Sequence, residues 1–542
     1  MNVAIKIRDY KRFGITAFSL LLVVYFLYGI YFIYSTSFVI NGTRYFCLFD
    51  DAMISMRYAR NLAEGHGLRW NPGGEYVEGY SNFLFVLYMA LVHLLPIDGS
   101  KVSLIIQLTE LILVLYALSI IRKIAEFVAE GSKVIVTSSL FLTAFYYPIN
   151  NFALQGMDVG PILVIMSLVL LESLRCLQSK VVVSNRLLLL LGIGSLLRVD
   201  FLINFLAVPA FLLIARKRFQ AKRIMWVLLF IVIFVGGQTL FRYWNFGEFL
   251  PNTYYLKVTG ISASDRIMKG LAMANFFIRG ISVIPFLFAI LALIIPKKQN
   301  EKLLLAYVFI VQLAYSIYVG GDVWSWFGGA DRYVSVVMPF FLILLCYGIF
   351  KPLETIPIEG KRLFAFFVCM NILLSISLNT HNYMNLDYVL LKNPPLHVEM
   401  HPGAVIIAKV LREVTFPNAT ITVWRAGITP YFSNRTFIDL LGKNDAKIAR
   451  ERMQIKDWRE FHPGHNKWNY TYSIGEKDPD IIYGVDFTLI RYIPDIQKEY
   501  ISHRFILPTG NEVVFLKKSS PNILWDKLGK IEYNLETPYD EK

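Results

Sequence analysis

The sequence is poor in charged residues and in cysteine. Asp, Glu, Lys and Arg together make up 17% of its 542 residues, whereas a soluble domain carries roughly a quarter. Four cysteines are too few for a disulfide framework, and a chain with 55% hydrophobic residues is not disordered. These shortages exclude an ordinary soluble enzyme, a disulfide-rich scaffold and a disordered chain.

Long apolar runs are what the chain has instead. The first run, 14–34, follows four basic residues and is not followed by a cleavage site, so we expect an uncleaved anchor with a cytoplasmic N-terminus. Ten later runs lie at approximately 102–121, 134–149, 159–174, 187–198, 201–215, 224–241, 280–295, 303–319, 333–350 and 363–378. The sequence therefore predicts a polytopic α-helical membrane protein with about eleven transmembrane helices, plus juxtamembrane helices.

The net charge of +14 points to the bilayer. In a soluble protein such an excess would suggest nucleic acid. Here much of the excess lies in five short basic loops between apolar runs, as the positive-inside rule expects of cytoplasmic loops. We therefore expect a lipid bilayer, and no nucleic acid, as a partner.

The apolar stretch 83–95 decides the topology. Its thirteen residues fall short of the roughly 20 that a span needs. The five basic loops share one side only if this stretch does not cross, which predicts a juxtamembrane or re-entrant helix. The alternative, twelve spans, would place most of the basic loops outside.

The last third of the chain differs from the rest in composition. After residue 378, proline, glycine and charge occur throughout, with short β-like runs at 420–424 and 512–516. This pattern predicts a compact α/β domain over 379–542 on the extracytoplasmic side. Residues 1–378 form the transmembrane domain, with a first exterior loop over 36–82.

Two adjacent carboxylates, Asp50 and Asp51, follow the first apolar run. Such neighbours repel each other, so a site must stabilise them with a cation, an arginine or hydrogen bonds. The simpler alternative is that they cap the N-terminus of a helix expected over 51–64.

Mixed clusters of Asp, Arg, Asn and Tyr favour the predicted exterior loops, while the inner loops carry mostly Lys and Arg. Snorkelling cations and interfacial aromatic belts would place such residues on both faces, so the asymmetry predicts an exterior active site. Arg and Lys bind phosphate, aromatic rings pack against sugars, and a carboxylate can accept a hydroxyl proton. This combination suits sugar transfer from a lipid phosphate.

The stretch 50–81, DDAMISMRYARNLAEGHGLRWNPGGEYVEGYS, resembles the first exterior loop of the mycobacterial terminal arabinofuranosyltransferase family. That family belongs to the GT-C superfamily of polyprenyl-phosphate-sugar-dependent glycosyltransferases. The segments 250–258, 320–322 and 332–333 are similar to the family pattern, as are parts of 420–470. Arg198-Val199-Asp200 departs from it, since Arg-Pro-Asp is more usual there.

The resemblance implies a GT-C fold, with residues 1–378 as its catalytic domain. It also implies transfer of a sugar, arabinofuranose in that family, from a polyprenyl-phosphate donor to a cell-envelope glycan or lipid acceptor. The transfer would occur on the extracytoplasmic face of a bacterial cytoplasmic membrane. By the family pattern, the general base is Asp50 or Asp51.

Other positions follow as hypotheses. We expect Arg242, Lys257 and Arg332 to hold the donor phosphate. The expected substrate-binding residues are Arg57, Tyr58, Arg60, His66, Trp70, Asn71, Glu78, Tyr80, Arg198, Asp200, Asn252, Tyr254, Tyr255, Asp322, His465 and Lys467.

Two alternatives stay open. No cofactor is certain, and a divalent cation held by Asp50, Asp51 and Asp322 is a secondary option. The other function considered is a lipid-linked sugar flippase or transporter, which would place its site at the bilayer midplane. Glu110, in the middle of a predicted span, is the main sequence feature in its favour.

Overall fold

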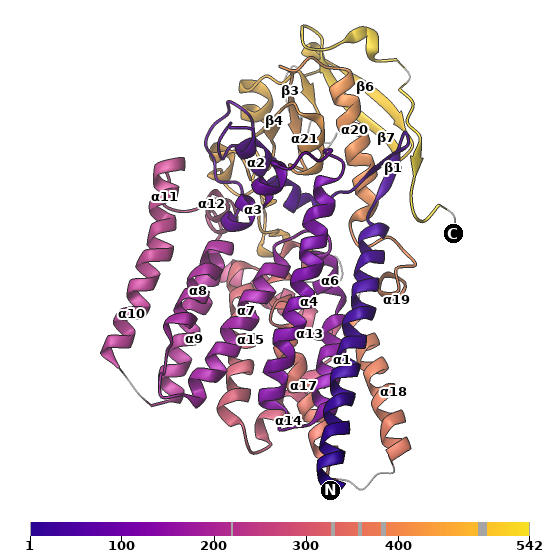
Figure 1. Cartoon of the computed structure of the whole chain (residues 1–542). Coiled ribbons are helices and arrows are strands. Elements are labelled where there is room, and N and C mark those ends of the chain that lie inside the picture. The colour runs from indigo at the N-terminus through magenta and orange to yellow at the C-terminus, as the bar shows by residue number, and fades with distance from the viewer. Residues whose placement is uncertain are drawn as a thin grey trace.

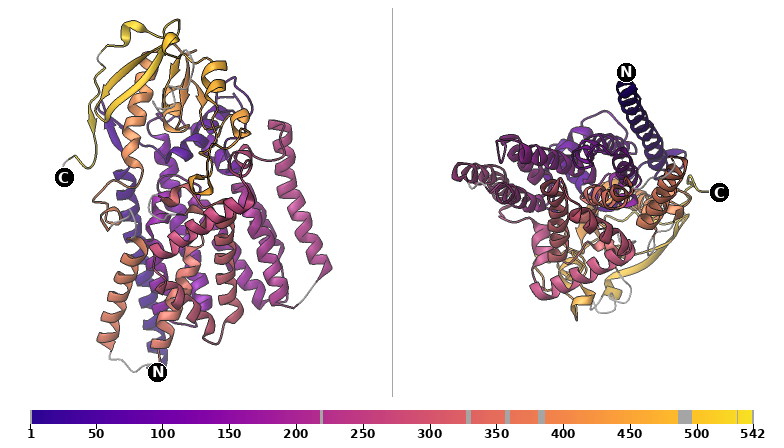
Figure 2. Two further views of the ribbon diagram at one scale, coloured as in Figure 1. Left: turned by 180° about the vertical axis from the view of Figure 1, so that it is seen from behind. Right: turned by 90° about the horizontal axis from the view of Figure 1, so that it is seen from below.

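The computed structural model describes residues 2–217, 220–326, 331–355, 360–380, 386–485, 496–529 and 531–540. A bundle of helices extends away from a C-terminal part that contains a β-sheet, and the N-terminus lies at the far end of the bundle (Figure 1). Viewed from below, many of the helices are seen nearly end-on, so they run roughly parallel (Figure 2).

Each predicted apolar run falls on one or more helices of the bundle. These helices are α1 (Asn2–Ser35), α4 (Val102–Val128), α5 (Lys133–Ala144), α6 (Tyr147–Ala153), α7 (Val159–Gln178), α8 (Asn185–Leu197), α9 (Leu202–Ala215), α10 (Ala221–Ile231), α11 (Gly237–Phe246), α13 (Ala263–Gly280), α14 (Ile284–Ile294), α15 (Gln299–Val319), α17 (Met338–Leu353) and α18 (Gly360–Asn379). Of these, α13 lies almost wholly outside the predicted runs.

Five helices of the described residues are long and apolar enough to cross a membrane, and α13 with α14, bent by 90°, make a sixth if they form one span. The five are Thr16–Ser35, Val102–Val128, Val159–Gln178, Ala221–Phe246 and Gln299–Val319. Shorter apolar helices, such as α5, α8 and α17, accompany them in the bundle. The protein is therefore a multi-pass membrane protein, while the count of eleven spans stays a prediction.

The stretch that decides the predicted topology forms α3 (Phe83–His93). At about 1.5 Å per residue, its 11 residues cover about half of the hydrocarbon core. It packs against α2, α4 and α8 at the end of the bundle nearest the C-terminal part (Figure 1). Its length and position favour a juxtamembrane helix.

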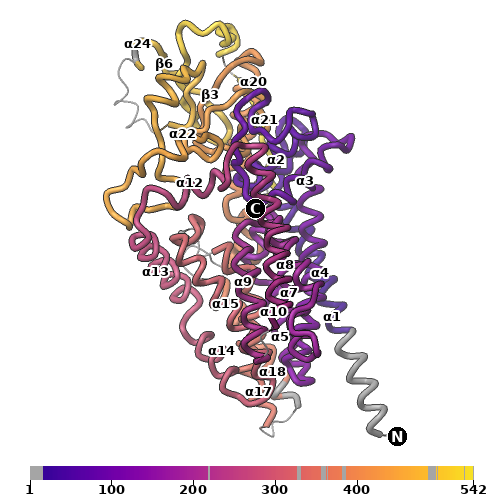
Figure 3. Tube along the Cα trace, turned by 90° about the vertical axis from the view of Figure 1, so that its left-hand side faces the viewer, coloured from indigo at the N-terminus to yellow at the C-terminus, as the bar shows by residue number. Residues whose placement is uncertain are grey.

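The helix predicted over 51–64 is α2 (Asp50–Ala63). Its two leading carboxylates stabilise the positive end of the helix dipole. Most of its side chains are buried, including Arg57, because α2 packs against α3 on one side and α21 (Ile428–Ser433) on the other. It thus lies between the bundle and the C-terminal part (Figure 3).

A five-stranded sheet of order β4-β3-β5-β7-β6 organises the C-terminal part. Strands β3, β4 and β5 are parallel, while β7 pairs antiparallel with both β5 and β6. The strands are β3 (Thr420–Val423), β4 (Thr436–Asp439), β5 (Ile481–Ile482), β6 (Tyr500–Leu507) and β7 (Gly510–Lys517). Both predicted β-like runs are confirmed as strands, β3 and β7.

A second, smaller sheet ties the end of the chain to its beginning. Strand β1 (Phe38–Ile40) pairs with β2 (Thr43–Tyr45) and with β8 (Leu535–Glu536). The remaining α-helices are α12 (Asn252–Val258), α16 (Arg332–Ser335), α19 (Leu386–Val389), α20 (His401–Glu413), α22 (Ala446–Ala449) and α24 (Ile496–Glu499). The division predicted at residue 378 falls at the end of α18 and stays a prediction.

Candidate functional site

Asp50 joins α2 to α21. Its carboxylate accepts a hydrogen bond from the backbone amide of Ile428 at 2.9 Å. The two segments approach so closely that a Cβ on Gly427 would lie 1.9 Å from the Asp50 carbonyl oxygen. Burial raises the pKa of Asp50 above its ordinary value. The first acid of the pair therefore has a structural partner in the C-terminal part.

Asp51 is surrounded by donors from distant segments. The Lys443 Nζ atom lies 2.7 Å from one carboxylate oxygen. A guanidinium nitrogen of Arg332 and the indole nitrogen of Trp324 each lie 3.3 Å from the other oxygen. Burial alone would raise the pKa of Asp51, but the charges of Lys443 and Arg332 outweigh it and hold that pKa well below its usual range. Asp51 is therefore ionised at physiological pH.

Asp322 aims Arg332 at Asp51. The two Asp322 oxygens accept hydrogen bonds from the Arg332 Nε and NH2 atoms at 2.7 and 2.9 Å, a bidentate arrangement that fixes the guanidinium plane. Gly320 and Gly321 precede Asp322 with φ values of +92° and +84°, which only glycine adopts readily. The tight turn after α15 thus positions the whole pair.

A cavity of about 100 Å³ opens beside Asp51, bounded by α2, α12 and loops of the C-terminal part. Its charged lining residues are the carboxylates Asp51 and Asp158 and the cations Arg198, Lys257, Arg332 and Lys443. Tyr80 and His465 also line it. Positive side chains therefore outnumber negative ones, which favours an anionic ligand.

Lys257 is the lining cation that a ligand can engage most directly. Its ammonium group makes no hydrogen bond and no ion pair with the residues that the structure describes. Burial lowers the pKa of Lys257 to about 8. Burial and the nearby Lys443 lower the pKa of His465 to about 3, so this ring is neutral. The cavity thus holds an unpaired ammonium facing a carboxylate.

Arg198 forms a second charged group on the same wall. It binds Asp200 through two hydrogen bonds of 2.9 and 3.0 Å and lies 3.7 Å from Asp158. Its guanidinium also stacks over the Tyr333 ring, 5.1 Å from the centroid. The sequence hypothesis placed Arg198 and Asp200 at the site, and the structure brings them beside it.

Several predicted substrate-binding residues instead hold the first loop to the C-terminal part. Arg57 is buried and donates to the carbonyl oxygens of Trp70, Pro430 and Arg435 and to the side chain of Asn71. Asn71 in turn pairs with the backbone of β4, and the Trp70 indole donates to a backbone carbonyl of the C-terminal part. None of these three predicted residues lines the cavity.

The other predicted residues of the first loop divide in the same way. Tyr58 donates to the Val77 carbonyl oxygen at 2.7 Å and packs edge-on against Tyr80. Arg60 lies near the C-terminal end of α2, away from Asp51, and His66 lies beyond that end, near the surface. Of the four, Tyr80 lines the cavity.

Arg242, predicted to hold the donor phosphate, forms a buried ion pair with Glu78. Its guanidinium also donates to the Phe249 carbonyl oxygen at 3.2 Å. Neither Arg242 nor Glu78 lines the cavity. The pair ties α11 to the first loop, so the geometry brings Lys257 and Arg332 to Asp51 but not Arg242.

The residues predicted around α12 support the loop that carries Lys443. The Asn252 side-chain amide donates to the Gly442 and Lys443 carbonyl oxygens at 2.9 and 3.0 Å. Lys467 donates to the Tyr255 carbonyl oxygen at 2.9 Å. Tyr255 stacks with Arg450, and Tyr254 is exposed. None of these four residues lines the cavity.

Lys443 and Trp324 are the two contacts of Asp51 that sequence reasoning missed. Lys443 follows the segment 439–442, whose Asp439 accepts hydrogen bonds from the backbone amides of Leu441 and Asn444 and fixes a tight turn. The sequence signal for Lys443 was this turn, because a tight turn fixes the position of the residue that follows it. Trp324 lies between the segments 320–322 and 332–333, which the sequence resemblance had singled out.

The carboxylates do not suit a divalent cation. Asp322 is engaged by Arg332, and Asp51 accepts from Lys443, Arg332 and Trp324. Among the described residues, no group of three or more Asp, Glu, His or Cys side chains could hold a metal ion. With Asp322 and Asp51 engaged by guanidinium and ammonium groups and Asp50 by the Ile428 amide, the residues present do not fit the secondary option of a metal site.

Comparison with solved structures establishes the fold. ArnT from Cupriavidus metallidurans in the apo state matches with a TM-score of 0.53 at 13% identity, covering 93% of this chain and 98% of that chain. The same protein bound to undecaprenyl phosphate matches with a TM-score of 0.54 at 10% identity and the same coverage, 93% and 98%. The chain is thus a multi-pass membrane protein with a GT-C fold, as expected, while the count of eleven spans and the extracytoplasmic C-terminal domain stay predictions.

Sequence comparison adds one family match. Residues 397–517 match a family described as a domain of unknown function, DUF8728. No curated protein matches the sequence. The resemblance to the arabinofuranosyltransferase family therefore stays a prediction.

Proposed function

We propose that the protein is a membrane glycosyltransferase that moves a sugar from a polyprenyl-phosphate donor to a glycan or lipid acceptor. The observation that carries the proposal is the unpaired Lys257 ammonium, which shares a cavity with the ionised Asp51. A lipid phosphate needs a cation, and an acceptor hydroxyl needs a base. The likeness to ArnT, solved with undecaprenyl phosphate, supports the proposal at the level of the fold.

In this proposal Asp51, rather than Asp50, is the general base. Asp51 lines the cavity, whereas the Asp50 carboxylate is held by the Ile428 amide. Lys257 and Arg332 bind the donor phosphate. Lys443 lines the same cavity and contacts Asp51. A phosphate placed there competes for these cations, which raises the pKa of Asp51 and makes it a stronger base.

The transfer step follows from these positions. The acceptor hydroxyl oxygen bonds to the anomeric carbon while the bond from that carbon to the phosphate oxygen breaks. The hydroxyl proton passes to Asp51, and the lipid phosphate leaves with the electron pair. The cations around the cavity stabilise the charge that develops on this phosphate.

The finer assignments rest on the sequence alone, on its resemblance and on the distribution of charge between its loops. They are an arabinofuranose donor, an acceptor in the cell envelope, and an active site with the 379–542 domain on the extracytoplasmic face of a bacterial cytoplasmic membrane. Sharing a fold does not fix the sugar.

The transporter alternative rests mainly on Glu110. This carboxylate accepts a hydrogen bond from the backbone amide of Gly160 at 2.8 Å and thereby joins α4 to α7. Its other oxygen is buried without a hydrogen-bond partner among the described residues, so Glu110 combines a helix-joining contact with one unsatisfied acceptor.

Reconstitution in vesicles tests the function. Purified protein, a set of polyprenyl-phosphate sugars and envelope glycans are incubated, and free polyprenyl phosphate and extended glycan are measured by mass spectrometry. The proposal expects both products in equal amounts. Movement of intact donor across the vesicle membrane without its cleavage would contradict the proposal and favour the transporter.

A further inference from the structure

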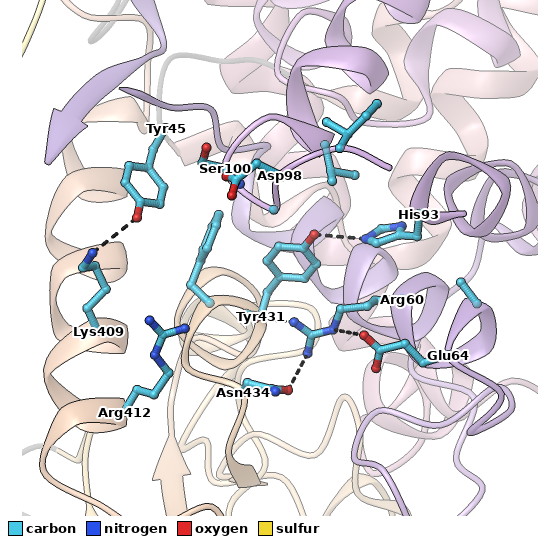
Figure 4. Close-up of a pocket in the computed structure, with 15 residues that line it drawn as sticks. Tyr45, Arg60, Glu64, His93, Asp98, Ser100, Lys409, Arg412, Tyr431 and Asn434 are labelled. Carbon is cyan, nitrogen blue, oxygen red and sulfur yellow. Dashed lines mark hydrogen bonds and ion pairs between the residues drawn. The ribbon is translucent and has the colours of Figure 1, made fainter. Parts of the chain in front are cut away.

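A second cavity, distinct from the one beside Asp51, lies at the other end of α2. It has a volume of about 470 Å³ and is enclosed by the end of α2, the α3–α4 connection, α20 and α21. Figure 4 shows its lining side chains. Arg60, which lines it, is nine positions after Asp51 in the sequence, about 14 Å along a helix. The two cavities are therefore separate.

Three cations reach this cavity from two sides. Arg60 extends from α2, while Lys409 and Arg412 extend from α20 (Figure 4). Arg60 donates to the Tyr431 carbonyl oxygen at 2.7 Å and lies 4.0 Å from Glu64, but its Nε atom is buried without a hydrogen-bond partner. Three cations thus line the cavity together with two carboxylates, Glu64 and Asp98, and this net positive charge favours an anion between the cations.

Lys409 and Arg412 have no carboxylate partner among the residues that the structure describes. Lys409 contacts the Tyr45 hydroxyl group at 3.3 Å, and the Arg412 guanidinium makes no hydrogen bond or ion pair within the described ranges. The second lining carboxylate, Asp98, accepts a hydrogen bond from the Ser100 amide at 2.8 Å. The cavity therefore keeps donors available for an anionic group.

Exposed leucines lie on the segment that leads into this cavity. Leu91, Leu94 and Leu95, at the end of α3, are 64%, 65% and 47% exposed, and they precede the lining residue Ile97. The helix that starts at the cavity, α4 from Val102, is one of the candidate spans. A cationic cavity beside exposed leucines at the end of a span matches an amphiphile with an anionic head and apolar chains.

We propose that this cavity binds the anionic headgroup of a membrane phospholipid, with its acyl chains along the leucines of α3. The phosphate lies between Arg60 and Arg412 and near Lys409. A soluble anion offers the same phosphate but gains nothing from the leucines, so the two sources are separable. The inference does not depend on the proposed function of the Asp51 cavity.

Native mass spectrometry of the purified full-length protein in detergent tests the proposal. Phosphatidylglycerol, phosphatidylcholine and inorganic phosphate are the probes. We expect phosphatidylglycerol to bind more tightly than phosphatidylcholine. We also expect the double variant Lys409→Gln/Arg412→Gln to weaken its binding about thirtyfold, from the loss of two basic groups near the surface. Lys527→Gln, an exposed lysine outside the cavity, is the matched control.

Hydrogen exchange of the wild-type protein tests the same site without a mutation. Phosphatidylglycerol should slow exchange in α20 and in residues 97–102, and phosphatidylcholine should not. Equal binding of both lipids, unchanged binding by the double variant, or protection elsewhere would overturn the proposal. Protection by inorganic phosphate as strong as that by phosphatidylglycerol would also overturn it, in favour of a soluble anion.

Discussion

Asp51 and Lys443 lie 2.7 Å apart although 392 residues separate them in the sequence. One belongs to the first loop after α1 and the other to the loop after β4 in the C-terminal part. The contact closes one wall of the cavity, so both parts of the chain build the candidate site. The C-terminal part therefore contributes a cation, Lys443, to the carboxylate of Asp51 in the candidate site.

The Lys443–Asp51 pair sets the pH dependence of the proposed reaction. The lowered pKa of Asp51 keeps it ionised, and Lys443→Met should raise that pKa because it removes the largest opposing charge. The acidic limb of the pH–rate profile should therefore move to higher pH. Asp51 stays ionised at neutral pH, so a fall in the rate there would report the loss of the Lys443 charge beside the donor phosphate. Lys443→Arg keeps the charge and should restore most of the profile. An unshifted acidic limb in Lys443→Met would contradict this role.

The same pair should stabilise the fold above acidic pH. Because the folded-state pKa of Asp51 is lowered, its stabilisation is fully present above the unfolded value, about 4, and is lost as the pH falls toward the folded value. The melting temperature of Asp51→Asn should therefore lie below that of the wild type at neutral pH and approach it in acid. A constant difference across the acidic range would argue against the ion pair.

Lys257 should make donor binding sensitive to alkaline pH. Its pKa of about 8 means that it loses its charge as the pH rises through that value, so the KM for donor should increase there. Lys257→Arg should flatten this increase because arginine keeps its charge. Lys257→Met should raise the KM about tenfold or more at neutral pH, with a smaller change in kcat. If the KM for donor changes neither with pH nor in Lys257→Met, Lys257 does not bind the donor.

Gly427 should tolerate no side chain. A Cβ there would lie 1.9 Å from the Asp50 carbonyl oxygen, and overpacking of this kind costs about 1–3 kcal/mol. Gly427→Ala should lower the melting temperature and loosen the contact between α2 and α21. Gly475→Ala, where a Cβ would meet no atom within 4 Å, is the control. Equal melting temperatures for the two variants would show that the approach is not so close.

Substitution of Arg57 should lower the stability of the fold more than the catalytic activity. Arg57→Met removes the donor to the Pro430 and Arg435 carbonyl oxygens, at a cost of about 1–3 kcal/mol for an acceptor left unsatisfied. The Trp70 carbonyl oxygen still accepts from the Asn61 amide at 3.0 Å. We expect a large fall in melting temperature and faster proteolysis of the first loop. A stable Arg57→Met variant with a raised KM would instead support the substrate role that the sequence suggested.

The sequence predicted the local features of the fold and missed its long-range pairs. Apolar runs gave the positions of the helices because burial in lipid depends on composition alone. Asp50 and Asp51 were found because adjacent carboxylates beside a span form a local signal. The Lys443 contact required pairing across 392 positions, which no local pattern contains.

The arginines show most clearly what cannot be predicted from the sequence. Arg57, Arg242 and Arg332 all occur in mixed polar motifs, and their sequences gave no reason to separate them. The structure buries Arg57 among carbonyl oxygens, pairs Arg242 with Glu78, and places only Arg332 in the cavity. Which partner an arginine finds is decided by packing between distant segments, so its role cannot be derived from its neighbours in the chain.

The central claim is that Asp51 is the base of a lipid-phosphate-dependent sugar transfer. Its most direct test is the rate of polyprenyl phosphate release per enzyme in the presence of acceptor, compared between Asp51→Asn and the exposed control Asp526→Asn. The account predicts a loss of about 100-fold or more for Asp51→Asn and an unchanged rate for Asp526→Asn, with donor still bound by both. Full release by folded Asp51→Asn would contradict it.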